Sequence, residues 1–139
     1  MELGELMVKN VVTASKQDSM AAAAKRMRDA RVGCLVVADG PAVQGIITDR
    51  DLIVRCVAGG HKAEECRISE HMSSPVMTAG PSMDILEAAH LLTEKQVKRL
   101  PVVEEGRLVG LVSVSDICRV LVRPMHDLLI GMGGGRRPA

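Results

Sequence analysis

The feature that most constrains the fold of this chain is an internal repeat. A shift of 65 residues places Met7 on Met72 and Asp51 on Asp116, with no gap between them. Further identities in the same register are Val11 with Val76, Thr13 with Thr78, Ala23 and Ala24 with Ala88 and Ala89, Leu35 with Leu100, and Gly45 with Gly110. The chain is therefore expected to contain two copies of one structural unit.

Each copy contains the pattern of an amphipathic helix. Its apolar residues recur at the i, i+3, i+4 and i+7 positions that share one helix face. They are Met20, Ala23, Ala24 and Met27 in the first copy, and Ile85, Ala88, Ala89 and Leu92 in the second. Ser19 and Asp84 precede these runs and are the expected N-caps. Because only one face is apolar, each helix should cover a sheet.

The other elements also occur in matched pairs. Short extended segments are expected at 10–13 and 75–78, and hairpins at 34–38 with 43–48 and at 100–103 with 108–113, because turn-forming residues separate the two runs. A second helix should begin at Thr48 or Ser113, and the first of these should end at Gly59 and Gly60. Each copy is thus expected to be a small three-stranded sheet with two helices.

The predicted boundaries follow from this pattern. They are 1–61 for the first repeat, 62–70 for a polar linker, 71–125 for the second repeat, and 126–139 for a flexible tail rich in Gly and Arg. A unit of about 60 residues buries only about 60% of the surface of its unfolded chain. The two repeats are therefore expected to pack sheet against sheet around a pseudo-twofold axis.

Composition excludes several classes of partner. The 139 residues include 18 Lys and Arg and 17 Asp and Glu, so a net charge of +1 gives no bulk attraction to nucleic acid or anionic lipid. Phe, Trp and Tyr are absent, so a flat ligand cannot stack on an aromatic ring. No apolar run approaches the ~18 residues of a membrane span, and no signal-peptide pattern occurs. We expect a cytoplasmic protein with neither a membrane nor a nucleic-acid partner.

The cysteines and histidines match no recognised metal or catalytic pattern. Cys34, Cys56, Cys66 and Cys118 lie in apolar segments and are expected to be reduced and mostly buried. Neither the spacing of Cys56, His61 and Cys66 nor the addition of His71 matches a structural zinc pattern. No catalytic motif occurs, so we predict no metal, no catalytic residue, no catalytic cofactor and no enzymatic activity.

One motif ends the hairpin of both copies: Gly45-Ile46-Ile47-Thr48-Asp49-Arg50-Asp51 and Gly110-Leu111-Val112-Ser113-Val114-Ser115-Asp116. A hydroxyl followed three residues later by a carboxylate can form a capping box that satisfies the helix's own N–H groups. The same arrangement suits a nucleotide, because helix N–H groups and a hydroxyl bind phosphate while a carboxylate accepts hydrogen bonds from a ribose diol. Both interpretations remain open at this point.

This motif, repeated, with Arg99-Leu100-Pro101-Val102-Val103 upstream of its second copy, resembles the cystathionine β-synthase (CBS) domain pair, or Bateman module, over about residues 5–123. The segments Thr48-Asp49-Arg50-Asp51 and Gln96-Val97-Lys98-Arg99 are similar to small actinobacterial two-CBS proteins of the hypoxic-response type. The resemblance implies an α/β fold of two tandem CBS repeats in a homodimer. It also implies a regulatory module that binds AMP, ADP, ATP or S-adenosylmethionine and acts in trans on an unknown protein target.

The resemblance further implies two clefts, each built from both repeats. The first would combine Ile46, Ile47, Thr48 and Asp51 with Met77, Thr78, Lys98 and Arg99. The second would combine Leu111, Val112, Ser113 and Asp116 with Val12, Thr13, Gly33 and Cys34.

These two clefts are predicted to differ in charge. Lys98 and Arg99 would place two cations beside the first, whereas Gly33 and Cys34 would place none beside the second. The first is therefore predicted to bind a phosphorylated nucleotide, and the second to be empty or to take an uncharged adenosyl ligand. The alternative function is a structural, protein-binding dimer without a nucleotide, in which both motifs are only helix caps.

Overall fold

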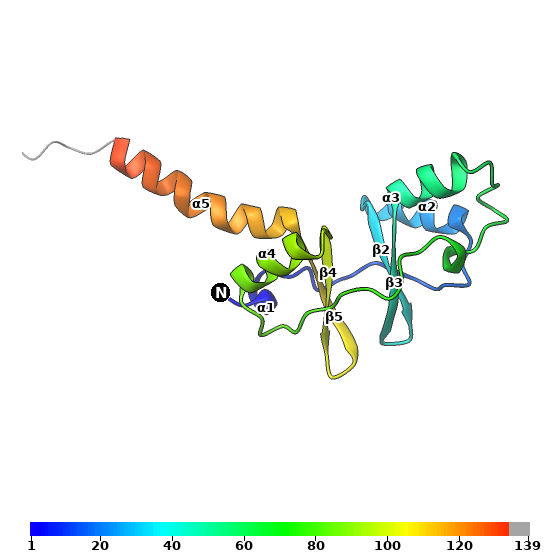
Figure 1. The fold of residues 1–139 in the computed structure, drawn as a ribbon, viewed down its shortest axis with the longest axis horizontal. Helices are drawn as coiled ribbons and strands as arrows, with labels where there is room; N and C mark the ends of the chain where they lie inside the picture. The colour runs from blue at the N-terminus through cyan, green and yellow to red at the C-terminus, as the bar shows by residue number, and fades with distance from the viewer. Residues whose placement is uncertain (134–139) are drawn as a thin grey trace, which may run out of the picture.

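The computed structural model describes residues 1–133 and contains two similar halves (Figure 1). The first half contains β1 (Thr13–Ala14), α2 (Met20–Ala30), β2 (Cys34–Asp39), β3 (Ala42–Thr48), α3 (Asp49–Asp51) and the π-helix η1 (Leu52–Val57). The second contains α4 (Ile85–Glu94), β4 (Arg99–Glu104), β5 (Arg107–Ser113) and α5 (Val114–Gly133). Two short helices, α1 (Leu3–Leu6) and η2 (Ile68–Glu70), precede the two halves.

The sheets follow the repeat register. In the first half β1 runs parallel to β2, and β2 pairs antiparallel with β3, in the order β1-β2-β3. The hairpin of β4 and β5 has the same register, with an irregularity at the equivalent place in each hairpin: between Val37 and Ala38, and between Val102 and Val103.

The second sheet differs from the three strands that were expected. It contains only β4 and β5, and the third segment contributes a single parallel bridge between Ala79 and Val102. Gly80 and Pro81 follow at once, and proline has no N–H with which to extend a strand ladder.

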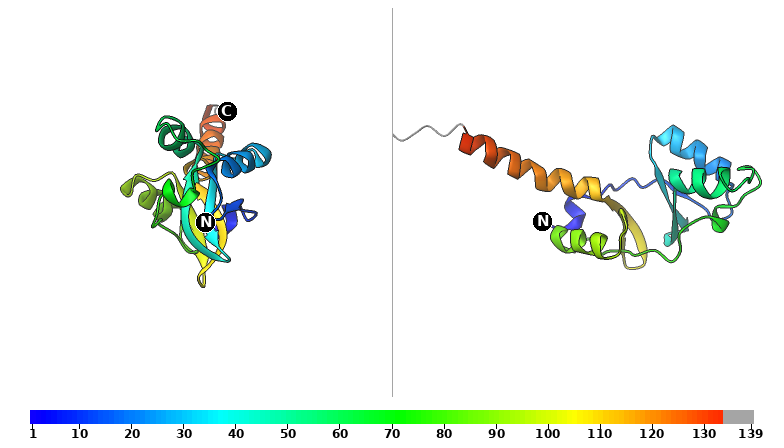
Figure 2. Two further views of the ribbon diagram at one scale, coloured as in Figure 1. Left: turned by 90° about the vertical axis from the view of Figure 1, so that its right-hand side faces the viewer. Right: turned by 45° about the horizontal axis from the view of Figure 1, so that its top comes forward.

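The amphipathic helices form as predicted. Ser19 Oγ accepts a hydrogen bond from the Ala22 N–H at 3.0 Å, and Asp84 Oδ1 accepts one from the Leu86 N–H at 2.9 Å. The buried residues of α2 and α4 are Met20, Ala23 and Met27, and Ile85, Ala88 and Leu92. Both helices lie on the outer side of their sheet, so that the two sheets face each other (Figures 1 and 2).

Each half has its own hydrophobic core, but each core includes residues from outside the predicted boundaries of that half. Leu3 of α1 is fully buried in the core of the second half, where its N–H donates to the Met83 carbonyl at 2.9 Å. Cys66 and Ile68, expected in a polar linker, are buried in the core of the first half. The boundaries 1–61 and 62–70 were therefore wrong as packing units, because each half is completed by the segment that precedes the other.

These exchanged segments cross the opposite sheet at a glycine. A Cβ on Gly45 would lie 2.7 Å from the Ser73 carbonyl oxygen and 2.9 Å from Met72 Sδ. A Cβ on Gly110 would overlap the side chain of Met7, the residue equivalent to Met72. Backbone hydrogen bonds secure both crossings, between Ile46 and Ser73 and between Val8 and Leu111.

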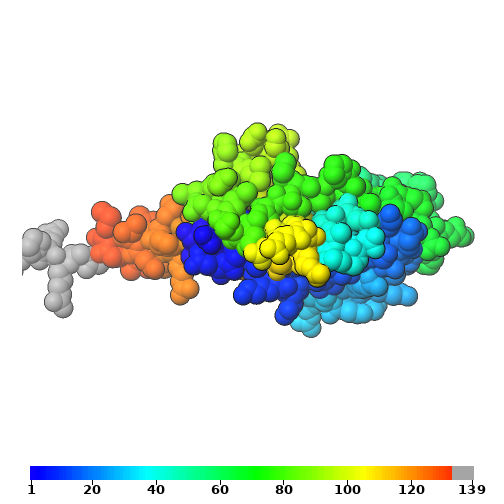
Figure 3. Space-filling model, turned by 90° about the horizontal axis from the view of Figure 1, so that it is seen from below, coloured from blue at the N-terminus to red at the C-terminus, as the bar shows by residue number. Residues whose placement is uncertain are grey.

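The halves meet through the hairpins as well. Strands β3 and β5 contact each other, and the Leu108 N–H donates to the Pro41 carbonyl at 2.9 Å. The two hairpin tips, cyan and yellow in Figure 3, consequently lie side by side. The predicted packing of sheet against sheet, with the halves related by a pseudo-twofold axis, is confirmed.

The last helix is longer than expected. Residues 126–133, placed in a flexible tail, continue α5 to Gly133, and residues 134–139 of that tail lie outside the described residues. Beyond the second half α5 leaves the body of the molecule (Figure 1). Its exposed apolar residues include Met125, Leu128 and Leu129. Among residues 1–133, no helix is both long and apolar enough to cross a membrane.

The glycine crossings can be tested by adding one methyl group. We expect Gly45→Ala to lower the free energy of unfolding by about 1–3 kcal/mol, because the new Cβ meets the Ser73 backbone. Chemical denaturation followed by circular dichroism measures this. The matched control is Gly80→Ala, since a Cβ there meets nothing within 4 Å in the described chain. Equal stability of both variants and the parent would contradict a tight crossing.

Candidate functional site

The two hydroxyl–carboxylate motifs form equivalent structures at the start of α3 and of α5. Thr48 Oγ1 and its backbone N–H both donate to Asp51 Oδ2 at 2.9 Å, and the Asp51 N–H donates back to Thr48 Oγ1 at 3.1 Å. Ser113 and Asp116 form the same three hydrogen bonds, at 2.9, 2.9 and 3.2 Å. The capping box considered at the sequence level is thus present in both halves.

The second oxygen of each carboxylate faces an arginine three or four residues further along the chain. Asp51 Oδ1 lies 3.5 Å from Arg55 Nε, and Asp116 Oδ1 lies 3.5 Å from Arg119 Nη2. The two aspartate side chains are 15% and 17% exposed, whereas the arginine side chains are 52% and 77% exposed. Within residues 1–133, the ion-pair partner of each Oδ1 is therefore an exposed arginine, and such a surface pair is weak enough for a ligand hydroxyl to displace it.

A cavity of about 400 Å³ lies beside the second motif. It contains six of the residues predicted for the second cleft: Val12, Gly33, Cys34, Leu111, Ser113 and Asp116. The remaining lining residues are Val8, Asn10, Val11, Val32, Arg99, Ser115 and Arg119. The cleft between the repeats thus forms from the N-terminal segment, the start of β2, the end of β5 and the start of α5.

The charge of this cleft differs from the prediction. Arg99 was assigned to the first cleft, but it lines the second one together with Arg119. The cause lies in the repeat, because Cys34 and Arg99 occupy equivalent positions at the starts of β2 and β4 and approach each other between the halves. Burial raises the pKa of the Cys34 thiol, nearby Arg99 lowers it, and Asp49 raises it further. The expectation that no cation lies beside the second cleft was therefore wrong.

Two predicted site residues lie in the cores instead. Ile47 and Val112 are fully buried in the first and second cores. Side chains alternate between the faces of a strand, so their neighbours Ile46 and Leu111 point to the opposite face. Leu111 lines the cleft accordingly.

The other predicted residues lie in varied surroundings. Thr13 is exposed in β1 and does not line the second cavity. Met77 and Thr78 are exposed in the segment before Ala79, where the first cleft was expected. Lys98 lines a separate groove between α4 and α5, with Thr93, Gln96 and Cys118 among its neighbours. The ligand-binding role of all these residues, and of Thr48, Asp51 and Ile46, remains a prediction.

Sequence reasoning missed Asn10 and Arg119 in the second cleft. Arg119 lies three residues after Asp116 on a helix, so the two side chains share a face. This spacing was present in the sequence and could have identified Arg119. Asn10 had no such signal, because its place depends on the crossing of the N-terminal segment onto β5.

These features can be compared with known proteins. A family model of the CBS domain matches residues 3–57 and 68–123, which cover both repeats. The chain belongs to the CBS domain family. This CBS pair is 30% identical over 126 residues to hypoxic response protein 1 of Mycobacterium tuberculosis, covering 90% of this chain and 87% of that protein. It is 35% identical over 122 residues to the uncharacterized protein MK0525 of Methanopyrus kandleri, covering 85% of this chain but only 61% of that protein.

Solved structures show the same fold. The CBS domain pair of protein MJ0100, in complex with 5′-methylthioadenosine and S-adenosyl-L-methionine, aligns with a TM-score of 0.80 at 27% identity, covering 89% of this chain and 98% of that one. Hypoxic Response Protein I with two coordinated zinc ions aligns with a TM-score of 0.77 at 29% identity, covering 86% and 98%.

A second group of side chains gathers in the first half, away from the cleft. Cys56, Cys66 and His71 lie together, although their spacing in the sequence matched no ligand pattern. Burial, and secondarily the neighbouring Cys56 thiol, raise the pKa of the Cys66 thiol. Of the four thiols, Cys34, Cys56 and Cys66 are buried as expected, whereas Cys118 is exposed.

The caps can be tested without any ligand. We expect Thr48→Ala and Ser113→Ala each to lower the free energy of unfolding by about 0.5–2 kcal/mol, because each removes the hydroxyl that accepts a helix N–H. Denaturant titration measures the change. Ser82→Ala, at an exposed serine, is the control. If the cap variants match this control, the reciprocal hydrogen bonds do not stabilise the helices.

Proposed function

We propose that this CBS pair is a regulatory module that binds an adenosine-containing ligand in its second cleft. The observation that carries the proposal is the grouping of Ser113, Asp116, Arg99 and Arg119 around one cavity of about 400 Å³, a size typical of small-molecule sites. The complex of the MJ0100 pair with two adenosyl compounds supports the adenosine part.

The polar groups of the cleft favour a phosphorylated ligand. Two arginines and one aspartate line the cavity, so its lining carries a net positive charge. Arg99 is the stronger candidate for the phosphate, because it lies at a strand start between the two halves, whereas Arg119 already faces Asp116. Guanidinium groups bind phosphate through charge-assisted hydrogen bonds. We therefore propose AMP, ADP or ATP ahead of S-adenosylmethionine, whose sulfonium is a cation.

The remaining groups match the rest of a nucleotide. Asp116 Oδ1 can accept hydrogen bonds from a ribose diol if Arg119 moves aside. Val12, Val32 and Leu111 offer aliphatic surface for the base, which has no aromatic partner in this chain. The lining comes from both repeats, so a bound ligand would favour one relative angle between them. We propose that a partner protein detects this angle, and that the module thereby acts in trans.

Ligand binding can be tested by replacing two neighbouring cationic side chains, Arg99 and Lys98, one at a time. We expect AMP to bind, and Arg99→Ala to weaken AMP binding by at least ~10-fold, since a hydrogen bond to a charged group contributes about 1.5–3 kcal/mol. The same variant should bind uncharged 5′-methylthioadenosine nearly as well as the parent. Isothermal titration calorimetry at fixed salt measures both. Lys98→Ala is the matched control, because Lys98 lines a different groove.

Each contrary result has a distinct meaning. Loss of AMP binding in Lys98→Ala but not in Arg99→Ala would contradict binding of the phosphate in the second cleft. Failure of all adenosyl ligands to bind would favour the alternative function, a structural protein-binding dimer in which both motifs act only as helix caps.

We also propose that the module is a homodimer. The observation behind this is the exposed apolar surface of η1 and α5, which are equivalent helices of the two repeats. These residues are Ile53, Val54 and Val57 on η1, and Val122, Met125, Leu128, Leu129, Ile130 and Met132 on α5. Exposed apolar faces of this kind are typical of interaction surfaces. A second copy could cover both helices at once through a twofold axis.

Assembly of the dimer can be tested by introducing a charge on the exposed apolar face of η1 and on that of α5. We expect Val54→Glu and Met125→Glu to convert a dimer into a monomer, because a buried unpaired carboxylate strongly opposes association. Size-exclusion chromatography with light scattering measures the mass. Gln17→Glu, at an exposed position outside both helices, is the charge control. A parent protein that is already monomeric at micromolar concentration would contradict the proposal.

A further inference from the structure

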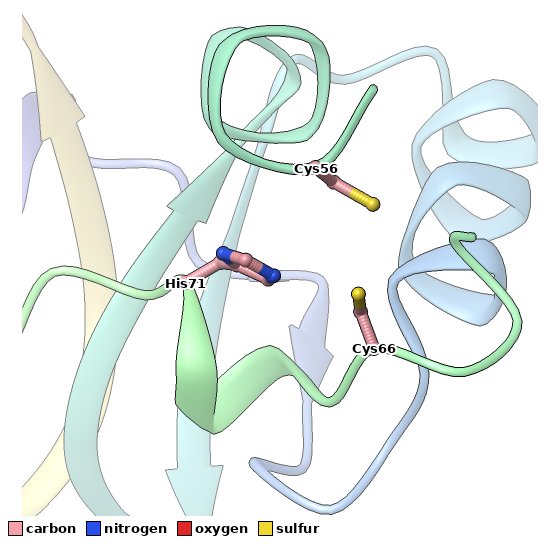
Figure 4. A group of neighbouring side chains, drawn as sticks. All are labelled: Cys56, Cys66 and His71. Carbon is pink, nitrogen blue, oxygen red and sulfur yellow. The ribbon is translucent and has the colours of Figure 1, made fainter. Parts of the chain in front are cut away.

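Two cysteines and a histidine converge in the first half, away from the nucleotide cleft (Figure 4). Cys56 lies near the end of η1, Cys66 in the loop before η2, and His71 immediately after η2. One ligand atom from each residue, the two sulfurs and a ring nitrogen, lies within 4.8 Å of the other two. Three segments that are separate in the sequence thus direct soft donor atoms at one point.

The histidine makes this grouping more than a chance contact of buried thiols. His71 is only 9% exposed, and its Nε2 has no hydrogen-bond partner among residues 1–133. A buried imidazole nitrogen without a partner is costly, and native proteins rarely leave one. Figure 4 shows the ring directed into the space between the two sulfurs. A metal ion bound there would satisfy this nitrogen.

The backbone holds the three residues in place independently of their side chains. The His71 N–H donates to the Ile68 carbonyl at 3.0 Å, and Arg55 Nη1 donates to the His71 carbonyl at 3.1 Å. The Cys66 carbonyl accepts from the Met20 N–H at 2.9 Å. With Cys56 fully buried and Cys66 5% exposed, the donor atoms are held in a largely dry site before any ion arrives.

We propose that Cys56, Cys66 and His71 bind a zinc ion. Two thiolates and one imidazole are preferred zinc ligands, with Zn–S near ~2.3 Å and Zn–N near ~2.0 Å, so tetrahedral donors lie somewhat under ~4 Å apart. Donor atoms within 4.8 Å of one another need only small side-chain movements to reach that geometry. On binding, each thiol that becomes a thiolate releases one proton to solvent, and no redox step occurs.

The fourth coordination position falls to water or to His61, whose exposed ring lies beside His71 with ring centroids 5.6 Å apart. Zinc would connect η1 to the segment that crosses to the other half.

The test uses the whole chain, purified under reducing conditions and stripped of metal. We expect one Zn²⁺ per chain to remain bound after gel filtration, measured by elemental analysis. We expect Co²⁺ to give the intense visible bands of a tetrahedral thiolate site, and Zn²⁺ to raise the thermal midpoint. Cys66→Ser and His71→Asn should each lose tight retention, whereas Cys118→Ser, at the exposed thiol, should retain Zn²⁺ like the parent.

A second measurement uses only the parent protein, so it tests the zinc site even if the variants fold poorly. In the parent protein, Zn²⁺ should protect Cys56 and Cys66, but not exposed Cys118, from alkylation detected by mass spectrometry. The proposal is overturned if the reduced parent retains no Zn²⁺ and gives no thiolate–cobalt bands. It is also overturned if Cys118→Ser loses the ion as completely as Cys66→Ser. Nucleotide binding is not needed for any of these readouts.

Discussion

The structure depends on the exchange of short segments between its two repeats. The residues before the first repeat complete the core of the second, and the residues before the second complete the core of the first. Both segments cross the opposite sheet where a glycine leaves room for a methionine, Gly110 for Met7 and Gly45 for Met72. Neither repeat can bury its core without the other, so the cleft between them follows from the same packing that gives stability.

The exchange also explains why capping and ligand binding do not exclude each other. Each Ser or Thr hydroxyl and one carboxylate oxygen stabilise a helix start, while the other carboxylate oxygen faces only an exposed arginine. The N-terminal segment then brings Val12 and Asn10 to the second of these helix starts. A helix cap thus becomes part of a cavity because a segment from the other half covers it.

The sequence predicted those elements whose signal is local. The periodicity of Met20, Ala23 and Met27 located α2, and the paired turns located both hairpins. It failed where the answer depended on contacts between distant segments. The buried position of Ile68, the place of Arg99 in the second cleft and the meeting of Cys56 with His71 all follow from how the segments cross. The extension of α5 was missed because Pro124 lies inside the helix and Gly131 and Gly133 near its end, and both residue types weaken a local helix signal.

The repeats are similar in backbone but not in chemistry, and this asymmetry follows from single positions. Cys34 and Arg99 are equivalent, so an exact repeat would carry two thiols or two guanidiniums between the halves, and a pair of guanidiniums would repel. One of each leaves a single guanidinium at the two strand starts, that of Arg99, which joins Arg119 in lining the second cleft. In the same way, Cys66 and His71 have no metal-binding counterparts in the segment before the first repeat, where Met1 and Leu6 occupy the equivalent positions. The segment that carries them continues to Ser73, which hydrogen-bonds to Ile46 two residues before Thr48. Under the two proposals, the first repeat would hold its segment with a metal ion and the second would bind an anion.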